Sequence, residues 1–481
     1  MKLSQLMGAL PYGVHDVDIT DVTNDSRAVK PGMAFVCLKG GSTDGHRFAV
    51  AAAEKGAAAV IAEHNVGVDC QVIVPDTHVV YAKMCSALYG DPKDRLKLIG
   101  VTGTNGKTTT TYLLKSVLEQ LGKKVGLIGT IHNMIGERVI PTENTTPDAH
   151  QLHALFREMA DAGCEYVVME VSSHALDQER VGGLHFAAAI FTNLTQDHLD
   201  YHGTMENYLA AKKKLFLRTD LAIVNADDAA SQAITEGLTC PVATYGIERP
   251  ATYQAKGIRY LPDGVVFELL GGTDIARVTL KTPGRFSVYN GLAAASCLLS
   301  LGFGYEQTAA CLSNAAGVPG RAEVVPLGRD FTVILDYAHT PDGLENILKT
   351  VNEIKRGRLV ILFGCGGDRD ATKRPIMGKI AADLADFCIV TSDNPRTEEP
   401  EAIIRDILEG MKGTSTPKKV IVNRRDAIRF ALENAEPDDM IVLAGKGHED
   451  YQIIGTTKHP FDERVVIREI LEETSGKDDR R

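Results

Sequence analysis

The sequence predicts an α/β protein of three domains, and three observations support this fold class. At 481 residues, the chain is longer than one hydrophobic core usually supports. Short apolar runs alternate with helical patterns, which is typical of parallel strands joined by right-handed crossovers. The polar run 90–95 and the Gly-rich stretch 317–321 interrupt this alternation. We therefore expect domains at residues 1–94, 95–319 and 320–481.

Each domain has its own pattern of expected elements. In the first, residues 49–62 indicate an amphipathic helix that runs into a strand, as in a small α/β domain. The middle domain alternates expected strands at 96–101, 124–128, 166–170, 187–192 and 221–224 with helices at 206–217 and 290–301, and has an antiparallel-looking part at 265–282. The last domain has expected strands at 332–335, 360–363, 387–391, 419–422 and 440–443. This alternation predicts a Rossmann-like, doubly wound sheet there.

Composition excludes several classes of protein. The chain is 44% hydrophobic and 24% charged, which is ordinary for a globular protein, and its formal net charge of -11 gives no field that would hold nucleic acid. Nine cysteines are scattered without any Cys-x-x-Cys spacing, which favours a reducing compartment over disulfides or a zinc site. No uncharged apolar run reaches the ~18 residues that a membrane span needs. We expect a cytoplasmic protein without membrane insertion, and a monomer.

A strand at 96–101 leads into a glycine-rich turn and then a helix, which is the pattern of a phosphate site. The turn reads Gly103-Thr104-Asn105-Gly106-Lys107-Thr108-Thr109. Glycines let backbone N–H groups face an anion, and the start of the helix favours negative charge. Lys107 would reach the outer phosphates, and the Thr108 hydroxyl would bind Mg²⁺. The strict spacing of such loops fails by one residue, because Val101 stands where the first glycine should be. The sequence predicts an ATP-binding central domain of the P-loop type.

Three further residues of the middle domain are candidates for chemistry. Glu170 ends an expected strand and could share the Mg²⁺ with Thr108. His198 follows another expected strand, where it could be a metal ligand, a phosphate contact or a packing residue. Lys212 shares a helix face with Leu215 and other apolar residues, which predicts that it is buried. A buried lysine must lose its charge, find a partner or be modified. The spacing of Lys212 equally fits a lysine at the edge of that face that reaches solvent.

Three expected strands of the last domain end in charged residues, namely Arg369, Arg396 and Glu449. Because parallel strands end at one edge, these side chains should line one crevice. Two guanidiniums and a carboxylate suit a ligand that carries both carboxylate and ammonium groups. A surface network of salt bridges is the alternative for any one of them.

These motifs resemble the Mur ligase family over almost the whole chain. The loop 103–108 is similar to the family's ATP loop, and Asp336-Tyr337-Ala338-His339-Thr340-Pro341 is similar to its C-terminal signature. Residues 287–290 and Gly320-Arg321 look like its contacts on the ATP side. The resemblance implies ATP binding by Gly103, Thr104, Asn105, Gly106, Lys107, Thr108, Thr109, Asn290, Arg321, Asp336 and His339.

The resemblance also implies a second substrate and a modified lysine. Within the family, residues 144–147 and 170–180 look like the member that adds the third peptide residue to UDP-N-acetylmuramoyl-L-Ala-D-Glu. The residues implied to bind this nucleotide are Ser26, Gly41, Ser42, Thr43, Asn144, Thr145, Thr146, Ser172, Gln178, Arg180 and Lys212. Lys212 matches the lysine that family members carbamylate with CO₂, which would make it a ligand of a second Mg²⁺ beside His198 and Glu170.

The incoming amino acid follows from the same resemblance. Asp393-Asn394-Pro395-Arg396 matches the family's signature for meso-diaminopimelate, and the implied set is Arg369, Asp393, Asn394, Pro395, Arg396, Gly445 and Glu449. Diaminopimelate has a carboxylate at its far end that a guanidinium can bind, whereas lysine has none. An ATP-dependent amide ligase of peptidoglycan precursor synthesis is expected. The rivals are an L-lysine-adding ligase, a ligase like folylpolyglutamate synthase, a P-loop motor or switch, and a non-catalytic nucleotide-binding module.

Overall fold

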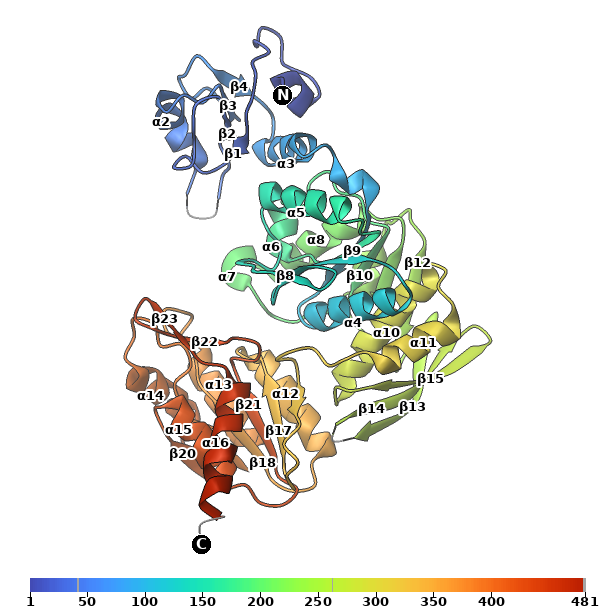
Figure 1. Ribbon diagram of the computed structural model, residues 1–481, viewed down its shortest axis with the longest axis vertical. Coiled ribbons are helices and arrows are strands. Elements are labelled where there is room, and N and C mark those ends of the chain that lie inside the picture. Colours follow the sequence, from blue (N-terminus) through green and yellow to red (C-terminus); the bar gives the residue numbers. More distant parts are fainter. Residues whose placement is uncertain (41–42, 262, 479–481) are drawn as a thin grey trace. The chain divides into compact units, whose positions relative to one another are not determined.

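The computed structural model describes residues 1–40, 43–261 and 263–478 (Figure 1). The chain packs into two compact units. One comprises Met1–Gln254 and Leu292–Cys311, and the other comprises Ala255–Gly291 and the chain from Leu312 onward. Within the described ranges, no helix is both long and apolar enough to cross a membrane.

The first unit begins with a small parallel sheet in the order β1-β2-β3-β4. Its strands are β1 (Val22–Thr23), β2 (Ala34–Val36), β3 (Ala59–Ala62) and β4 (Gln71–Ile73), with helices α1 (Leu3–Met7), α2 (Ala49–Glu54) and α3 (Thr77–Leu88). Two short 3-10 helices, η1 (Gly45–Phe48) and η2 (Pro92–Arg95), complete it. Residues of α1 and α3 cover one face, and residues of α2 cover the other. The predicted helix that runs into a strand is therefore confirmed as α2 and β3.

The central sheet of the first unit has the order β12-β11-β10-β5-β9-β6-β7-β8. Neighbouring strands are parallel from β12 to β6, and β7 and β8 are antiparallel. The strands are β5 (Lys97–Thr102), β6 (Val125–Ile128), β7 (Asn133–Ile135), β8 (Arg138–Ile140), β9 (Tyr166–Glu170), β10 (Ala188–Phe191), β11 (Ala222–Asn225) and β12 (Val242–Gly246). Because β5 lies between β9 and β10, the carboxyl ends of these three strands meet at one edge.

Helices connect these strands. They are α4 (Lys107–Gln120), α5 (Ala149–Asp161), α6 (Ser173–Asp177), α7 (Leu199–His202), α8 (Met205–Phe216) and α9 (Ser231–Thr235). The chain crosses between the units at three points, within strand β13 (Tyr253–Leu261) and within the helices α10 (Arg285–Ser300) and α11 (Tyr305–Asn314). In the second unit, β14 (Gly264–Gly271) and β15 (Asp274–Leu280) form the antiparallel pair that the sequence predicts.

The second unit also contains a sheet in the order β16-β17-β21-β18-β19-β20. Its strands are β16 (Glu323–Val325), β17 (Thr332–Asp336), β18 (Leu359–Phe363), β19 (Phe387–Val390), β20 (Lys418–Val420) and β21 (Met440–Ala444), and only β16 is antiparallel. Helices α12 (Pro341–Ile354), α13 (Lys373–Leu384) and α14 (Pro400–Gly410) cover one face, and α15 (Arg424–Glu433) and α16 (Glu463–Asp478) cover the other (Figure 1). A hairpin of β22 (Tyr451–Ile454) and β23 (Thr457–Pro460) follows β21. The doubly wound sheet is confirmed, and the domain boundaries after residues 94 and 319 stay a prediction.

Candidate active site

The glycine-rich loop lies between the end of β5 and the start of α4, and two of its glycines are required by geometry. Gly103 has a φ of +149°, and a Cβ added there would lie 1.8 Å from the Thr192 Oγ1. Gly106 has a φ of +87° and caps the start of α4. Side chains are disfavoured in such conformations, so the loop can pass close to β10 only with glycine. The first turn of α4 leaves its N–H groups without intrahelical acceptors, which suits an anion.

Two residues at the end of β10 hold the loop in place. The Asn193 Oδ1 accepts the Asn105 N–H at 2.9 Å, and the Asn193 Nδ2 donates to the Asn105 carbonyl at 3.1 Å. The Thr192 hydroxyl donates to the same carbonyl at 2.6 Å. The Thr104 N–H donates to the Asn193 carbonyl at 2.9 Å. Because the amides of Thr104 and Asn105 are used in this way, a phosphate would bind mainly at the start of α4.

Lys107 folds back over the loop. Its ammonium donates to the carbonyls of Gly103 at 2.9 Å and Thr104 at 2.8 Å. These hydrogen bonds hold the positive charge beside the start of α4, where the outer phosphates of a nucleotide would lie.

Glu170, the last residue of β9, is a buried carboxylate beside the loop. The Thr108 hydroxyl donates to both of its oxygens at 3.0 Å. Thr130, the second residue after β6, donates to Glu170 with its N–H at 2.8 Å and its hydroxyl at 3.0 Å. Gly129 leaves the space, since a Cβ there would lie 2.5 Å from the Glu170 Oε1. A buried carboxylate next to a hydroxyl supplies the hard oxygen ligands that Mg²⁺ prefers, so these residues fit the predicted ion.

Lys212 on α8 is buried, with 1% of its surface exposed. Its ammonium donates to the Gly103 carbonyl at 2.8 Å and lies 4.3 Å from the centre of the Tyr208 ring. Burial lowers the pKa of Lys212 well below its ordinary value, and the charge of Lys107 lowers it further. The structure thus decides the question of the helix face in favour of a buried lysine beside the phosphate loop.

His198 lies near this group, but its described contacts are with other residues. The ring is 3.3 Å from the Asp197 carboxylate, packs against His174 with centroids 4.8 Å apart, and lies 6.3 Å from the Tyr208 ring centroid. Among the residues that the structure describes, no three His, Cys, Asp or Glu side chains form a metal-binding group. No contact between His198 and Glu170 is recorded among the described residues, so their shared role stays a prediction. The Tyr208 ring links His198 to Lys212, since it lies 6.3 Å from the His198 ring and 4.3 Å from the Lys212 ammonium.

The segments 144–146 and 172–180 meet beside Glu170. The Thr146 hydroxyl donates to the Glu170 carbonyl at 2.8 Å and accepts the Ser172 N–H at 3.0 Å. Arg180 donates to the Thr146 carbonyl at 2.9 Å and to the Gln178 Oε1 at 2.8 and 3.0 Å. Two further residues of the predicted set adjoin this group. The Thr145 hydroxyl lies 3.0 Å from that of Thr130, and Asn144 is exposed.

Two of the predicted uridine residues lie in connections of the small parallel sheet, Ser26 between β1 and β2 and Thr43 between β2 and η1. The Ser26 carbonyl accepts a hydrogen bond from Lys55 at 2.8 Å. Thr43 is exposed, and its carbonyl accepts the Gly40 N–H at 2.8 Å. Gly41 and Ser42 lie outside the described residues. No contact among the described members of this set joins them into one site.

The remaining residues predicted on the ATP side lie in the second unit. Both carboxylate oxygens of Asp336 accept backbone N–H groups, from Ala322 at 2.7 Å and from Ala338 at 2.8 Å. The guanidinium of Arg321 lies 4.9 Å from the Tyr337 ring centroid. Two further members of the set are His339, which is exposed and donates from Nδ1 to the Tyr337 carbonyl, and Asn290, which is buried on α10.

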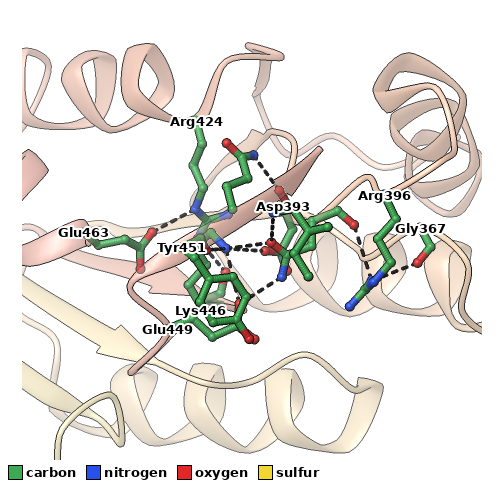
Figure 2. Close-up of polar contacts among 12 residues, drawn as sticks. Gly367, Asp393, Arg396, Arg424, Lys446, Glu449, Tyr451 and Glu463 are labelled. Atoms are coloured by element: carbon green, nitrogen blue, oxygen red, sulfur yellow. Dashed lines mark hydrogen bonds and ion pairs between the residues drawn. The ribbon is translucent and has the colours of Figure 1, made fainter. Parts of the chain in front are cut away.

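The residues predicted to bind an amino acid gather at three adjacent strand ends, those of β18, β19 and β21. Arg396, with a φ of +52°, donates to the Gly367 carbonyl at 2.9 Å. The Asn394 Nδ2 donates to the Glu449 Oε2 at 2.9 Å. Figure 2 shows the pairing of Arg396 with Gly367 and, in the same view, Glu449. The other predicted members are the buried Asp393 and Pro395, the exposed Arg369, which donates to the Asp368 carbonyl, and Gly445, which faces Asp393. Carboxylate, amide and guanidinium groups thus lie within one cluster.

Sequence reasoning missed several residues of these groups. Asn193 holds the loop, Thr130 binds Glu170, and Tyr208 packs against Lys212. Lys446 lies at the centre of the strand-end cluster. A signal existed for the first two, because each follows a strand of the predicted parallel sheet within two residues. Tyr208 lies four residues before Lys212, on the same helix face.

ATP-dependent α/β ligases combine two features that this chain has. One is a phosphate loop that joins a strand of a parallel sheet to a helix. The other is a polar cluster at the strand ends of a second, doubly wound sheet. Models of the Mur ligase family match residues 18–89 ("Mur ligase family, catalytic domain"), 101–298 ("Mur ligase middle domain") and 320–447 ("Mur ligase, glutamate ligase domain"). The chain belongs to the Mur ligase family.

Individual relatives agree with this assignment. The chain is 48% identical to the UDP-N-acetylmuramoyl-L-alanyl-D-glutamate--2,6-diaminopimelate ligase of Caldanaerobacter subterraneus subsp. tengcongensis, over 98% of this chain and 100% of the relative. A solved structure of a ligase with the same name is 33% identical, with a TM-score of 0.73 and 99% of both chains covered. The folylpolyglutamate synthase of Mycobacterium tuberculosis, at 18% identity, has a TM-score of 0.64 over 77% of this chain and 93% of its own, and thus shares the fold.

Proposed function

We propose that this protein uses ATP to join meso-diaminopimelate to UDP-N-acetylmuramoyl-L-Ala-D-Glu, in the cytoplasmic synthesis of peptidoglycan precursors. The names of its relatives support this substrate pair. The observation that carries the choice of amino acid is the cluster at the ends of β18, β19 and β21. There, a guanidinium held by the Gly367 carbonyl adjoins the Asn394 and Glu449 pair, which suits the carboxylate and the ammonium at the far end of diaminopimelate.

The reaction has two steps. The γ-phosphate of ATP transfers to the γ-carboxylate of D-glutamate, which gives an acyl phosphate and ADP. The amine of diaminopimelate then attacks the acyl carbon, phosphate leaves, and the amine loses a proton. Lys107 and the first turn of α4 hold the phosphates and offset the charge that develops on them. Mg²⁺, when bound by Thr108 and Glu170, supplies further positive charge at these oxygens.

We propose that Lys212 carries a carbamate. A neutral amine attacks CO₂ to form an N–C bond, and the nitrogen releases one proton. Burial favours the neutral amine, as the lowered pKa of Lys212 indicates. The product would replace a cation that burial disfavours with an anionic oxygen, and it would hold a second Mg²⁺ with Glu170 and His198 as the other proposed ligands. The UDP-linked substrate would also lie against this group.

The other roles complete the proposal. The UDP-linked dipeptide would be bound by the residues that the resemblance implies, namely Ser26, Gly41, Ser42, Thr43, Asn144, Thr145, Thr146, Ser172, Gln178 and Arg180. Asn290, Arg321, Asp336 and His339 would contact ATP, and residues 1–94, 95–319 and 320–481 would be the UDP-substrate, ATP and amino-acid domains. Since ATP and the amino acid would bind to different domains, domain closure would bring them together. We expect the monomer to be active.

One assay tests this function against its rivals. The purified protein receives ATP, Mg²⁺ and the UDP-linked dipeptide, with meso-diaminopimelate, L-lysine or no amino acid, and phosphate release and product mass are measured. Phosphate release that needs both small substrates, with a product of the diaminopimelate mass, is expected. Preference for lysine would overturn the argument from Arg396, and phosphate release without either substrate would favour a motor or switch.

The variant Arg396→Lys sharpens this test. It keeps the positive charge but loses the planar fork that binds a carboxylate through two hydrogen bonds. We expect the KM for diaminopimelate to rise roughly 10-fold to 100-fold, with the KM for ATP unchanged. Arg405→Lys, at an exposed position of α14, is the matched control.

A further inference from the structure

Lys446 is the second residue after β21, and its side chain has no exposed surface. Its ammonium donates to the Tyr451 carbonyl at 2.8 Å and to the Asn394 Oδ1 at 3.1 Å. It also lies 3.3 Å from one carboxylate oxygen of each of Asp393 and Glu449 (Figure 2). A lysine buried to this degree cannot reach a ligand in the crevice, so its effect must pass through these neighbours.

The backbone directs this lysine inward. Gly445 and Gly447, on either side of it, have φ values of +112° and +54°. A Cβ at Gly445 would lie 3.0 Å from the Asp393 Oδ2, and one at Gly447 would lie 2.8 Å from the Tyr337 N. The chain therefore turns away from the line of β21 at both glycines, and the Lys446 side chain points back under the crevice rather than into it.

Lys446 fixes the orientation of the Asn394 amide. The Asn394 Oδ1 accepts from the Lys446 ammonium at 3.1 Å and from the Ile453 N–H at 2.9 Å. Both partners are donors only, so the amide oxygen must face them. The amide nitrogen then faces Glu449, to which it donates at 2.9 Å. Without the ammonium, the amide oxygen would lose one of its two donors, and the Ile453 N–H and the Glu449 carboxylate alone would oppose a flip of this amide.

The same ammonium positions Glu449. Asn394 and Lys446 both approach the Glu449 Oε2, at 2.9 and 3.3 Å. Among the described residues, no hydrogen bond to the second oxygen is recorded, so that oxygen can accept from an incoming ammonium. Burial raises the pKa of the Glu449 carboxyl, Asp393 raises it further, and Lys446 and Asn394 oppose the rise. Lys446 thus favours the ionised form that would bind a cation.

The charges of this group are unequal. Two carboxylates, those of Asp393 and Glu449, face one ammonium in a largely buried space. Buried charges are stable when they are paired, and one more positive charge would balance this set. An ammonium group at the far end of the amino acid supplies that charge.

We propose that Lys446 is a positioning residue for the incoming amino acid, because it sets the Asn394 amide and the Glu449 carboxylate in the orientation that binds an ammonium-bearing ligand. This inference rests on the proposed function, since the ligand is the diaminopimelate of that proposal. A purely structural lysine would stabilise the fold without affecting the binding of one substrate more than another.

The experiment compares Lys446→Met, which keeps the length of the side chain and removes its charge, with the wild-type protein. Steady-state kinetics in the full reaction give kcat and the KM of each of the three substrates, and thermal unfolding gives Tm with and without diaminopimelate. Lys355→Met is the matched control, because Lys355 is also ion-paired, with Asp386, but lies at the opposite ends of the strands.

We expect Lys446→Met to raise the KM for diaminopimelate at least 10-fold. The KM values for ATP and the UDP-linked dipeptide should stay within twofold, and kcat at saturating diaminopimelate within about threefold. The rise in Tm that diaminopimelate causes in the wild-type protein should be lost. Lys446→Gln, which keeps an N–H donor, should show a smaller increase of the same KM, and it supplies the measurement if the methionine variant does not fold.

Two outcomes would overturn the inference. One is a KM for diaminopimelate within twofold of the wild-type value, and the other is an equal rise in all three KM values with a lower Tm, as a structural role predicts. If the wild-type protein itself shows no activity that depends on diaminopimelate, the proposed function fails instead, so the two failures are distinguishable.

Discussion

The side-chain amide of Asn193 binds the backbone of Asn105 from both sides. Its Oδ1 accepts the Asn105 N–H at 2.9 Å, and its Nδ2 donates to the Asn105 carbonyl at 3.1 Å. This pairing joins the end of β10 to the loop that follows β5. These two hydrogen bonds extend the pairing of β10 with β5 beyond Phe191 and Thr102, the last residues that the two strands pair.

Asn193→Ala should therefore weaken the use of ATP without affecting the amino acid. The loop would lose two hydrogen bonds, each contributing about 1 kcal/mol, and the loop would sample other conformations. We expect kcat/KM for ATP to fall roughly 10-fold to 100-fold. Asn434→Ala, at an exposed end of α15, is the control. An unchanged kcat/KM for ATP would mean that the loop holds its shape without Asn193.

Lys212→Ala should abolish activity. High bicarbonate should not restore it, since no amine remains to form a carbamate, whereas a short-chain carboxylic acid should restore part of it by placing a carboxylate in the vacated space. Steady-state rates with and without each additive provide the measurement. Lys213→Ala, one residue along the same helix, should keep near wild-type activity. Full activity of Lys212→Ala would reject the carbamate.

Arg424 and Glu463 form a fully buried ion pair, with 2.8 Å between the Arg424 Nε and the Glu463 Oε1. Arg424→Met should lower the free energy of unfolding by about 3–5 kcal/mol, because it leaves a buried carboxylate unpaired. The double variant Arg424→Met with Glu463→Leu should recover most of this loss, since an apolar pair of similar volume needs no solvation. Urea unfolding measures both. A double variant as unstable as the single one would contradict this.

His153 predicts a pH dependence of stability. The ring is fully buried on α5, and burial, aided by the charge of Lys93, lowers its pKa from 6.5 to about 4. The unfolded chain therefore binds a proton that the folded chain does not bind between these pH values. The stability is present above pH 6.5 and is lost as the pH falls toward 4, by about 3 kcal/mol.

Urea unfolding of His153→Leu against wild type isolates this effect, because the other titrating groups cancel in the difference. Between pH 7 and pH 4, the wild-type protein should lose about 3 kcal/mol more than the variant. His185→Leu, at an exposed position, should follow the wild-type curve. Equal pH dependence of His153→Leu and wild type would show that the pKa of His153 is the same in the folded and unfolded chains.

Local patterns predicted most of the strands, and some of the site. β9 spans the predicted residues 166–170, because its apolar run has clear limits. The spacing of Lys212 to Leu215 placed it on the apolar face of its helix but left open whether it reaches solvent, and the structure shows it buried. By contrast, Asn193 meets Asn105 only because β10 lies next to β5, 88 residues away in sequence, and no local pattern encodes that order.

The same limit applies to the last domain. The strand ends revealed Arg396 and Glu449, since charges after apolar runs are visible in the sequence. The role of Lys446 depends on where two flanking glycines send its side chain, and on its meeting with Asn394, 52 residues earlier. Such a lysine has the appearance of an ordinary surface residue until the backbone is known.

The contact between Gly320 and the loop after β21 limits how this protein can change over evolution. A Cβ at Gly320 would lie 2.1 Å from the His448 N, and the Gly445 N–H donates to the Asp336 carbonyl at 3.0 Å. The segment at Gly320, predicted to contact ATP, and the loop after β21, predicted to bind the amino acid, thus pack backbone against backbone. A change in the sequence of one therefore affects the other. A new amino-acid preference must therefore arise at the rim of the crevice, at positions such as Arg369 and Arg396. A substitution at Gly320 or Gly447 would impair the use of both substrates together.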